Sequence, residues 1–306
     1  MSRADRGRNV LVHPPADPDA GRAGVEPGRT EPDTGRTPRA TAPQAAPPRA
    51  LGRPDADAWG TDPYANALRN GHGPLFLRRT DGWLLPLDVE RWCAGADAAD
   101  LSALRRCEGP VLDVGCGPGR LVAALAARGH RALGIDVSEV AVARTVRLGG
   151  YALRRSVFDP LPGEGRWGTV LLADGNIGIG GDPDRLLRRA AELLAPGGLL
   201  IAETVPQDLD ERVRVRLDDG RGVDGGGADG LFPWARLGSS ALLGYARPHG
   251  LRAEGQWEAD GRTFVALRRS RSVRTANQSA DSRNSAAVVS SQFPRNTSGD
   301  SPLAGS

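Results

Sequence analysis

The segment VLDVGCGPGR, residues 111–120, decides the fold of this chain. Its first four residues are apolar apart from one acid and predict a short buried strand. Its glycines predict a tight turn into a helix over residues 120–128. A helix that begins after such a turn presents unpaired backbone N–H groups and the positive end of its dipole, so it suits a polar or anionic ligand. A glycine turn that only joins strand to helix is the alternative.

The spacing of the glycines separates two kinds of nucleoside site. Dinucleotide sites favour G-x-G-x-x-G/A, in which the last small residue lets the helix approach a pyrophosphate. Here Arg120 occupies the place that must be small. With an acid two residues before the first glycine, the pattern D-x-G-x-G-x-G resembles motif I of the class I S-adenosylmethionine-dependent methyltransferases. The resemblance implies S-adenosyl-L-methionine as cofactor, bound by Asp113, Gly115, Cys116, Gly117 and Gly119.

A second acid lies at the end of the next apolar stretch, RALGID, residues 131–136. At the tip of a second parallel strand, Asp136 can accept hydrogen bonds from both ribose hydroxyls of a nucleoside, and Val137 lies beside it. The same acid would serve NAD, so Asp136 supports a nucleoside cofactor without naming it. The alternative is that Asp136 only caps the helix predicted over 138–148.

The segment SVFDPLP, residues 156–162, follows the third predicted strand. In the resembling family an acid or amide here meets the adenine amino group, and an apolar side chain covers the ring. The resemblance therefore implies Asp159 and Phe158 as adenine contacts. Aligned instead on Leu161 and Pro162, the family's acid falls on Val157. In that case backbone groups near Phe158 would read the adenine.

The segment LLADGNIGIGGD, residues 171–182, leaves the fourth predicted strand. The resemblance places Asp174 and Asn176 beside the methionine moiety and the methyl acceptor, although both are also common turn-forming residues. The segment lacks the (D/N)PPY motif, which argues against DNA or amide nitrogen as acceptor. His72 is the one histidine that could overhang the pocket as a general base, with a turn residue as the alternative. The catalytic candidates are thus Asp174, Asn176 and His72.

The rest of the chain alternates short apolar stretches with amphipathic ones. We expect further strands at 131–136, 151–158, 168–174 and 198–204, helices over 138–148, 182–194 and 239–247, and two closing antiparallel strands at 251–260 and 262–269. Such alternation is typical of a parallel sheet covered on both faces by right-handed crossovers. The expected fold class is α/β, with a doubly wound, mostly parallel, Rossmann-like seven-stranded sheet, an N-terminal cap and a β-hairpin insertion.

Composition divides the chain into four parts. Residues 1–57 are rich in Pro and Arg and residues 270–306 in Ser and Asn, so both are predicted to be disordered tails. Residues 58–108 form the cap, with a helix over 63–70, a hairpin at 75–79 and 83–87, and a helical pattern over 88–106. Residues 109–269 form the cofactor-binding domain. A hairpin at 206–236, with a glycine-rich tip near 225–230, is inserted in that domain as a lid.

The charged residues exclude several classes of protein. All 40 basic residues are arginine and the net charge is +3, so lysine-dependent Schiff-base, P-loop and Tyr-x-x-x-Lys chemistry is impossible. The arginines are scattered among acids, so we expect no nucleic-acid partner. Cys93, Cys107 and Cys116 lack paired spacing, so we expect neither disulfides nor a metal. Without a signal peptide or a membrane-span stretch, we expect a cytoplasmic protein with no membrane contact. The oligomeric state stays open.

These features predict a methyltransferase that moves a methyl group in line to an unidentified small-molecule acceptor. We expect the acceptor between the cap, the loop 174–180 and the inserted hairpin, in contact with Trp234 and His72. A catalytically silent S-adenosylmethionine-binding regulatory or partner-binding module is the alternative. A nicotinamide-dependent oxidoreductase fits less well because of Arg120, and an aminopropyl transferase because its acidic acceptor motif is missing.

Overall fold

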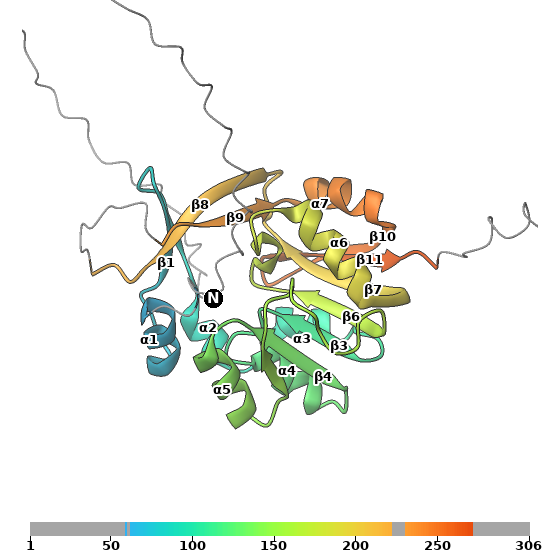
Figure 1. The fold of residues 1–306 in the computed structure, drawn as a ribbon, viewed down its shortest axis with the longest axis horizontal. Coiled ribbons are helices and arrows are strands. Elements are labelled where there is room, and N and C mark those ends of the chain that lie inside the picture. Colours follow the sequence, from blue (N-terminus) through green and yellow to red (C-terminus); the bar gives the residue numbers. More distant parts are fainter. Residues whose placement is uncertain (1–58, 60–61, 222–229, 272–306) are drawn as a thin grey trace, which may run out of the picture. The chain divides into compact units, whose positions relative to one another are not determined.

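The fold is built on a seven-stranded sheet (Figure 1). The computed structural model describes Trp59, residues 62–221 and residues 230–271. Sheet order is β10-β11-β7-β6-β3-β4-β5, and β11 runs against its neighbours while β3 to β7 are parallel. The strands are β3 (Val111–Val114), β4 (Ala132–Asp136), β5 (Ala152–Arg154), β6 (Trp167–Leu172), β7 (Leu194–Thr204), β10 (Leu251–Ala259) and β11 (Arg262–Arg269). The expected fold class is confirmed.

Helices cover both faces of this sheet, as the apolar strands require. Val111 packs towards α3 (Ala98–Leu104) and α4 (Arg120–Ala126), and α5 (Glu139–Arg147) lies beside α4. Leu112, the next residue of β3, packs on the other face with α6 (Pro183–Leu193) and α7 (Ser239–Ala246). Because successive side chains of a strand point to opposite faces, two apolar cores form from one sheet. None of the helices in the described ranges is long and apolar enough to cross a membrane.

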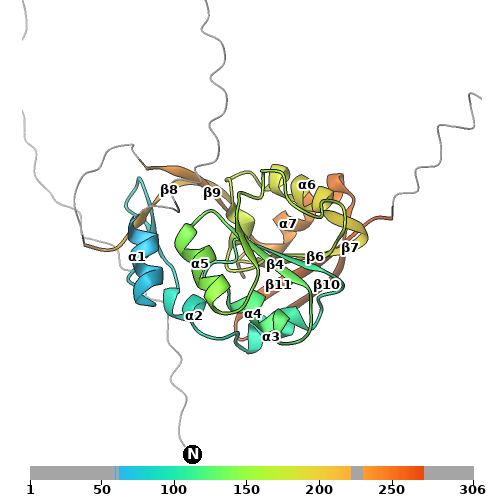
Figure 2. The same ribbon diagram turned by 60° about the horizontal axis from the view of Figure 1, so that its bottom comes forward.

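A second, four-stranded sheet joins the cap to the insertion (Figures 1 and 2). Its order is β2-β1-β8-β9 and all its pairs are antiparallel. The strands are β1 (Phe76–Arg79), β2 (Leu84–Pro86), β8 (Asp210–Asp218) and β9 (Phe232–Leu237). Leu77 of β1 lies opposite Leu217 of β8, and Val213 of β8 lies opposite Trp234 of β9. We call these four strands the roof sheet, because residues beside β2 and on β9 cover the pocket described below.

The cap differs from the sequence prediction in one place. The helical run expected over 88–106 is two helices, α2 (Val89–Cys93) and α3, which follow α1 (Asp62–Asn70) and the hairpin of β1 and β2. Asp88 accepts a hydrogen bond from the Arg91 N–H at 3.1 Å and so starts α2. Asp97 and Asp100 form a capping box that starts α3. Two N-cap residues nine positions apart require two helices, because each cap satisfies a separate set of unpaired N–H groups.

Strand β5 also ends earlier than expected, at Arg154 instead of residue 158. The chain turns at this point, where the Asp159 N–H donates to the Ser156 carbonyl at 3.1 Å. This turn brings Phe158 to the pocket below. Several other predictions fall outside the described residues: the tail 1–57, residues 272–306 of the second tail, and residues 222–229, which include most of the glycine-rich tip.

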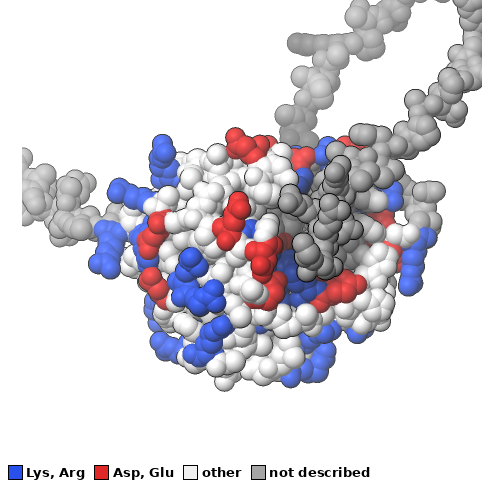
Figure 3. Space-filling model, turned by 180° about the vertical axis from the view of Figure 1, so that it is seen from behind, with Lys and Arg blue, Asp and Glu red and all other residues white. Residues whose placement is uncertain are grey.

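Charged side chains are distributed over the surface in mixed order. On the face seen in Figure 3, arginines and acidic side chains of the described residues lie interspersed. Some charged side chains pair across elements, as Arg79 does with Glu211 at 2.7 Å and Arg189 with Glu164 at 2.5 Å.

Candidate active site

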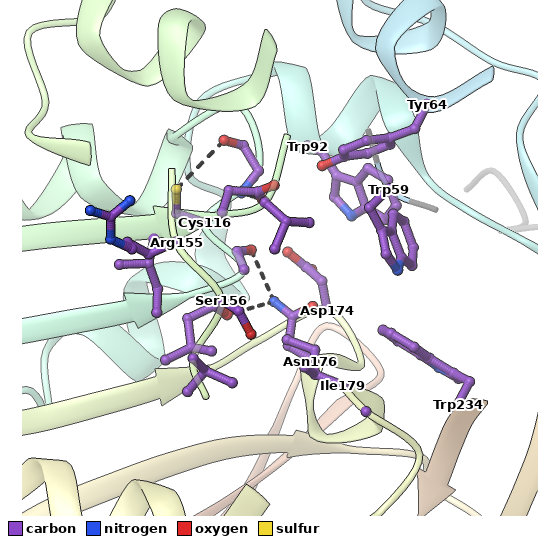
Figure 4. A pocket seen from close by; sticks show the side chains of 18 of the residues that line it. Trp59, Tyr64, Trp92, Cys116, Arg155, Ser156, Asp174, Asn176, Ile179 and Trp234 are labelled. Atoms are coloured by element: carbon purple, nitrogen blue, oxygen red, sulfur yellow. Dashed lines mark hydrogen bonds between the residues drawn. The ribbon is translucent and has the colours of Figure 1, made fainter. Parts of the chain in front are cut away.

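The main pocket lies at the carboxyl ends of β3, β4 and β6. Strand order reverses here, since β4 and β5 lie on one side of β3 and β6 on the other, and open α/β sheets bind ligands at such a switch point. The pocket encloses about 1030 Å³, its open mouth included (Figure 4). Its walls come from the turn after β3, the ends of β4 and β6, the segment after β5, the cap and the roof sheet.

The glycine turn after β3 packs tightly against its neighbours. Gly115, Gly117 and Gly119 have φ values of 71°, 54° and 93°, a region that favours glycine. A Cβ on Gly115 would lie 2.7 Å from the Asn176 Nδ2, and one on Gly119 would lie 2.5 Å from the Thr145 Oγ1. The turn therefore needs glycine both for its backbone conformation and for space. Gly117 and Cys116 line the pocket, and so does Gly115.

Asp136 holds the turn and faces the pocket. Its Oδ2 accepts from the Gly117 N–H at 2.9 Å and its Oδ1 from the Ser138 N–H at 2.8 Å. Burial raises the pKa of Asp136 to about 6, although these backbone N–H groups act to lower it. The cap of α5 is Ser138, whose Oγ accepts from the Ala141 N–H at 3.4 Å. Asp136 is thus not the helix cap. Each carboxylate oxygen has a further lone pair for a ligand hydroxyl.

Arg120 belongs to a buried cluster of arginines and carboxylates below the pocket. Its guanidinium donates to Asp100, from Nε to Oδ2 at 2.8 Å, and to Asp174, with Nη1 2.6 Å from Oδ2. Arg91 and Arg262 reach the Asp174 Oδ1 at 2.9 and 3.3 Å. Burial alone would raise the pKa of Asp174, but these arginines hold it below its usual range. Asp174 is therefore an ion-paired carboxylate and a poor general base.

Asn176 connects the two loops that form the floor of the pocket. Its Nδ2 donates to the Val114 carbonyl at 2.9 Å and to the Gly115 carbonyl at 3.0 Å, and the side chain lines the pocket. Asp174, two residues earlier, has a φ of 55°, which is uncommon outside glycine. Strain of this kind is kept where surrounding contacts fix the conformation, and here the ion pairs of Asp174 do so.

Aromatic side chains cover the opposite wall of the pocket. Trp59, Tyr64 and Trp92 come from the cap, and Phe232 and Trp234 from β9 (Figure 4). The Trp59 ring centroid lies 5.1 Å from that of Tyr64 and 5.5 Å from those of Phe232 and Trp234. We call these five side chains the aromatic wall. Burial, and then the nearby Asp136, raise the pKa of Tyr64 well above its ordinary value, so its hydroxyl stays protonated.

Comparison with known proteins places this pocket in a family. A family model described as a methyltransferase domain matches residues 90–254, which is more than half of the chain. The chain belongs to the methyltransferase domain family. The matched residues include the glycine turn, Arg120, Asp136 and Asp174.

This methyltransferase is similar to one named protein in sequence and to one solved structure in fold. The ubiquinone biosynthesis O-methyltransferase of Caulobacter sp. is 30% identical over 151 residues, 47% of this chain and 56% of that protein. The chain thus spans about half the length of that curated relative. A solved S-adenosylmethionine-dependent methyltransferase from Bacteroides fragilis, in complex with S-adenosyl-L-homocysteine, has a TM-score of 0.56 at 20% identity, over 72% of this chain and 98% of that one. This second likeness shows a shared fold, and the expected class I methyltransferase is confirmed.

The methyltransferase pocket brings together most of the residues predicted from sequence. Val137 and Phe158 line it, and the Arg185 guanidinium lies over the Phe158 ring, 4.0 Å from its centroid. Val157 lines it as well, whereas Asp159 does not. The Asp159 Oδ2 instead accepts from the Ser156 N–H at 3.3 Å, inside its own turn. Val157 and Phe158 therefore face the pocket, whereas the Asp159 carboxylate does not.

Three further predicted residues, Asp113, Gly119 and His72, lie away from the pocket lining. Asp113 is 1% exposed inside β3, and burial raises its pKa to about 7, although Arg120 acts to lower it. Its Oδ2 is buried without a hydrogen-bond partner in the described part of the chain. His72 is a surface residue whose Nδ1 lies 2.9 Å from the Gly73 carbonyl oxygen, and it does not reach the pocket.

Sequence reasoning missed Arg120 as a site residue and four members of the aromatic wall. In the sequence, Arg120 was used only as evidence against a dinucleotide site. An arginine directly after a glycine turn is also well placed to meet acids from other loops. The chain has six Trp, three Tyr and five Phe, and three of the six tryptophans line this one pocket. The position of Trp59 and Trp92 within the predicted cap was the available signal.

Proposed function

We propose that this methyltransferase transfers the methyl group of S-adenosyl-L-methionine to a small-molecule acceptor bound between the glycine turn and the aromatic wall. The observation that carries the proposal is the buried Asp136 carboxylate, which faces the pocket and is fixed to the glycine turn at the switch point of the sheet. A carboxylate in this position is suited to the two ribose hydroxyls of a nucleoside.

The residues present fit the cofactor along its whole length. Asp136 would hold the ribose, and Val137 and Phe158 would hold the adenine between apolar groups. Gly115 and Gly117 line the pocket, and their backbone would face the methionyl chain. When bound, the cofactor supplies an electrophilic methyl group on a sulfonium, so the protein contributes mainly orientation and exclusion of water.

The titratable groups of the pocket are not set up for proton abstraction. Asp174 is neutralised by three arginines, and burial raises the pKa of Tyr64 and of the Cys116 thiol. Among the described lining residues, Asp136 alone has a pKa near neutrality, and the ribose would occupy it. The acceptor therefore reacts through a group that is already nucleophilic or that loses its proton to solvent.

A small acceptor agrees with the dimensions and cover of the pocket. The space above the floor is bounded by the roof sheet and the cap, so a large polymer has no open groove to follow among the described residues. The named Caulobacter relative is an O-methyltransferase of ubiquinone biosynthesis, which supports a small-molecule acceptor in this chain as well.

Calorimetry with S-adenosylhomocysteine and NAD tests the proposal. The full chain is expected to bind S-adenosylhomocysteine and not NAD, because Arg120 fills the place that a pyrophosphate-binding turn needs small. Asp136→Ala is expected to weaken the binding of S-adenosylhomocysteine by about a hundredfold or more, since two charge-assisted hydrogen bonds are lost.

Asp159→Ala is the matched control for this test. This substitution removes a carboxylate that is close to the pocket but outside its lining. The affinity of the variant for S-adenosylhomocysteine is expected to stay within about twofold of wild type. Circular dichroism would establish that both variants are folded. Tighter binding of NAD, or an unchanged affinity in a folded Asp136→Ala protein, would contradict the proposed function.

A further inference from the structure

The two halves of the pocket differ in chemical character. The charged lining residues, Arg120, Asp136, Arg155 and Asp174, all belong to the floor, on the turns and segments that follow β3, β4, β5 and β6. The cap and β9 contribute only uncharged side chains, namely Trp59, Tyr64, Leu87, Trp92, Phe232, Pro233 and Trp234. The polar floor matches a charged nucleoside cofactor. The apolar half is therefore the part left for the acceptor.

The rings of the aromatic wall pack against one another instead of surrounding an open centre. Trp59 meets Tyr64 edge to face at 88°, and Phe232 meets Trp234 at 88° with centroids 6.3 Å apart. A cation would need free ring faces within about 6 Å on several sides, as in an ammonium cage. Rings packed edge to face and tilted offer single apolar faces and edges to the pocket, and one such face suits contact with a flat, uncharged ring.

The polar atoms of the wall are hydrogen-bond donors. The Trp92 Nε1 is buried and has no hydrogen-bond partner among the described residues, and the Tyr64 hydroxyl stays protonated. An indole N–H can only donate, and a buried donor without an acceptor is costly. The nitrogen is inaccessible as the wall stands, so the indole ring would have to rotate slightly before an oxygen on the ligand could satisfy it. Trp92 belongs to α2 of the cap, so this donor lies on the acceptor half and away from the ribose site at Asp136.

We propose that the acceptor is a flat, uncharged aromatic alcohol that stacks on the aromatic wall; this inference rests on the proposed function. In the reaction, a lone pair of the phenolic oxygen forms the bond to the methyl carbon. The sulfur–methyl bond breaks with its electron pair on sulfur, which leaves S-adenosylhomocysteine. The phenolic proton goes to solvent, since no lining group described above is placed to take it.

Calorimetry with the full chain saturated with S-adenosylhomocysteine tests the acceptor class. The probe is 2-naphthol, and two comparison ligands change one property each. Decahydro-2-naphthol keeps the skeleton and the hydroxyl but is not flat, and 2-naphthyltrimethylammonium keeps the rings but carries a positive charge. We expect 2-naphthol to bind about tenfold more tightly than either, because only 2-naphthol both stacks and avoids an unpaired charge.

Two substitutions of Trp92 separate stacking from simple apolar contact. Trp92→Phe keeps a ring and removes the N–H, and is expected to weaken 2-naphthol about threefold. Trp92→Leu removes the ring as well, and is expected to weaken the binding of 2-naphthol about tenfold. Both are expected to bind S-adenosylhomocysteine within about twofold of wild type. Trp83→Leu is the matched control, because Trp83 lies outside the pocket lining, near the guanidinium groups of Arg79 and Arg236.

The outcomes distinguish this inference from the function on which it rests. Equal binding of 2-naphthol and its saturated counterpart, or tighter binding of the cation, overturns the aromatic acceptor. So does a Trp92→Leu protein that is folded by circular dichroism and loses S-adenosylhomocysteine as strongly as 2-naphthol, since the wall would then belong to the cofactor. If wild type binds S-adenosylhomocysteine but not 2-naphthol, only the acceptor class fails. If it does not bind S-adenosylhomocysteine, the proposed function fails as well.

Discussion

At the scale of single residues, Asp136 shows how one carboxylate serves both fold and site. Its two hydrogen bonds to backbone N–H groups fix the glycine turn to the start of α5. Its burial disfavours the charged form and raises its pKa to about 6, within reach of physiological pH. A group that must be charged to accept ribose hydroxyls therefore titrates just below neutrality in the ligand-free protein.

Cofactor affinity should consequently depend on pH. Asp136 is mostly charged at pH 7 and mostly protonated at pH 5, so binding of S-adenosylhomocysteine is expected to weaken about tenfold between these values. Calorimetry at intervals from pH 5 to 8 measures the change. Asp136→Asn has no proton to lose, and its weaker affinity is expected to be constant over this range. A flat profile in wild type would show that the carboxylate stays charged to lower pH.

Asp113 is expected to make the fold less stable as pH rises. Its pKa is about 7 in the folded chain and 3.8 for an unperturbed carboxyl group, which stands for the unfolded chain. Between these two pH values the folded protein therefore binds the proton more tightly than the unfolded chain does. Stability is then lost as pH rises from about 4 to about 7 and levels off above the folded-state pKa, with a loss of about 1.4 kcal/mol between pH 6 and 8. Urea unfolding measures this loss, and Asp113→Asn is expected to remove it. An equal loss in the variant would assign the effect to other groups.

At the scale of elements, local pattern predicted almost every helix and strand. The parallel strands and their helices carry apolar residues at clear periods, which short-range sequence reveals. The break between α2 and α3 was missed because both halves are helical, and it depends on the capping residues Asp88 and Asp97. The pairing of β1 with β8 could not be predicted, because no local signal identifies a partner strand more than a hundred residues away.

The residues of the candidate site also fall into those that local sequence could predict and those that it could not. The position of Gly115, Gly117 and Asp136 at the pocket could be predicted, because all three lie at fixed spacing along one βαβ unit. The Arg120 ion pairs and the aromatic wall depend on which loops the fold brings together. The ion pairs and the wall combine residues of the cap, of the loop after β6 and of β9. Nothing in the sequence around these residues indicates that they meet in the folded chain.

The roof sheet gives a prediction at this scale. Leu77 of β1 is 1% exposed against Val215, Phe232 and Trp234, whereas Leu84 of β2 is 39% exposed. Leu77→Ala is expected to lower the free energy of unfolding by about 2–5 kcal/mol, and Leu84→Ala by about 0.5 kcal/mol or less. Denaturant unfolding of both variants measures the difference. Equal effects would mean that the roof sheet does not depend on its apolar face.

At the scale of the whole molecule, the tails are predicted to be dispensable. A chain of residues 58–270 is expected to fold and to bind S-adenosylhomocysteine as tightly as the full chain, because the removed segments contain few large apolar side chains. Thermal unfolding and calorimetry of the two proteins measure this. A drop of many degrees in melting temperature on truncation would reveal a tail that packs on the domain.

The pairing of β1 with β8 has a consequence for folding during synthesis on the ribosome. Residues 76–86 are synthesised early, but the strand that pairs with β1 is residues 210–218, and β9 follows only at 232–237. At ordinary rates of translation the β1–β2 hairpin has one unpaired edge for on the order of ten seconds. That edge carries Leu77, and an unpaired apolar edge invites other chains to pair with it. Nascent chains of this methyltransferase should therefore be most vulnerable to aggregation before residue 237 emerges.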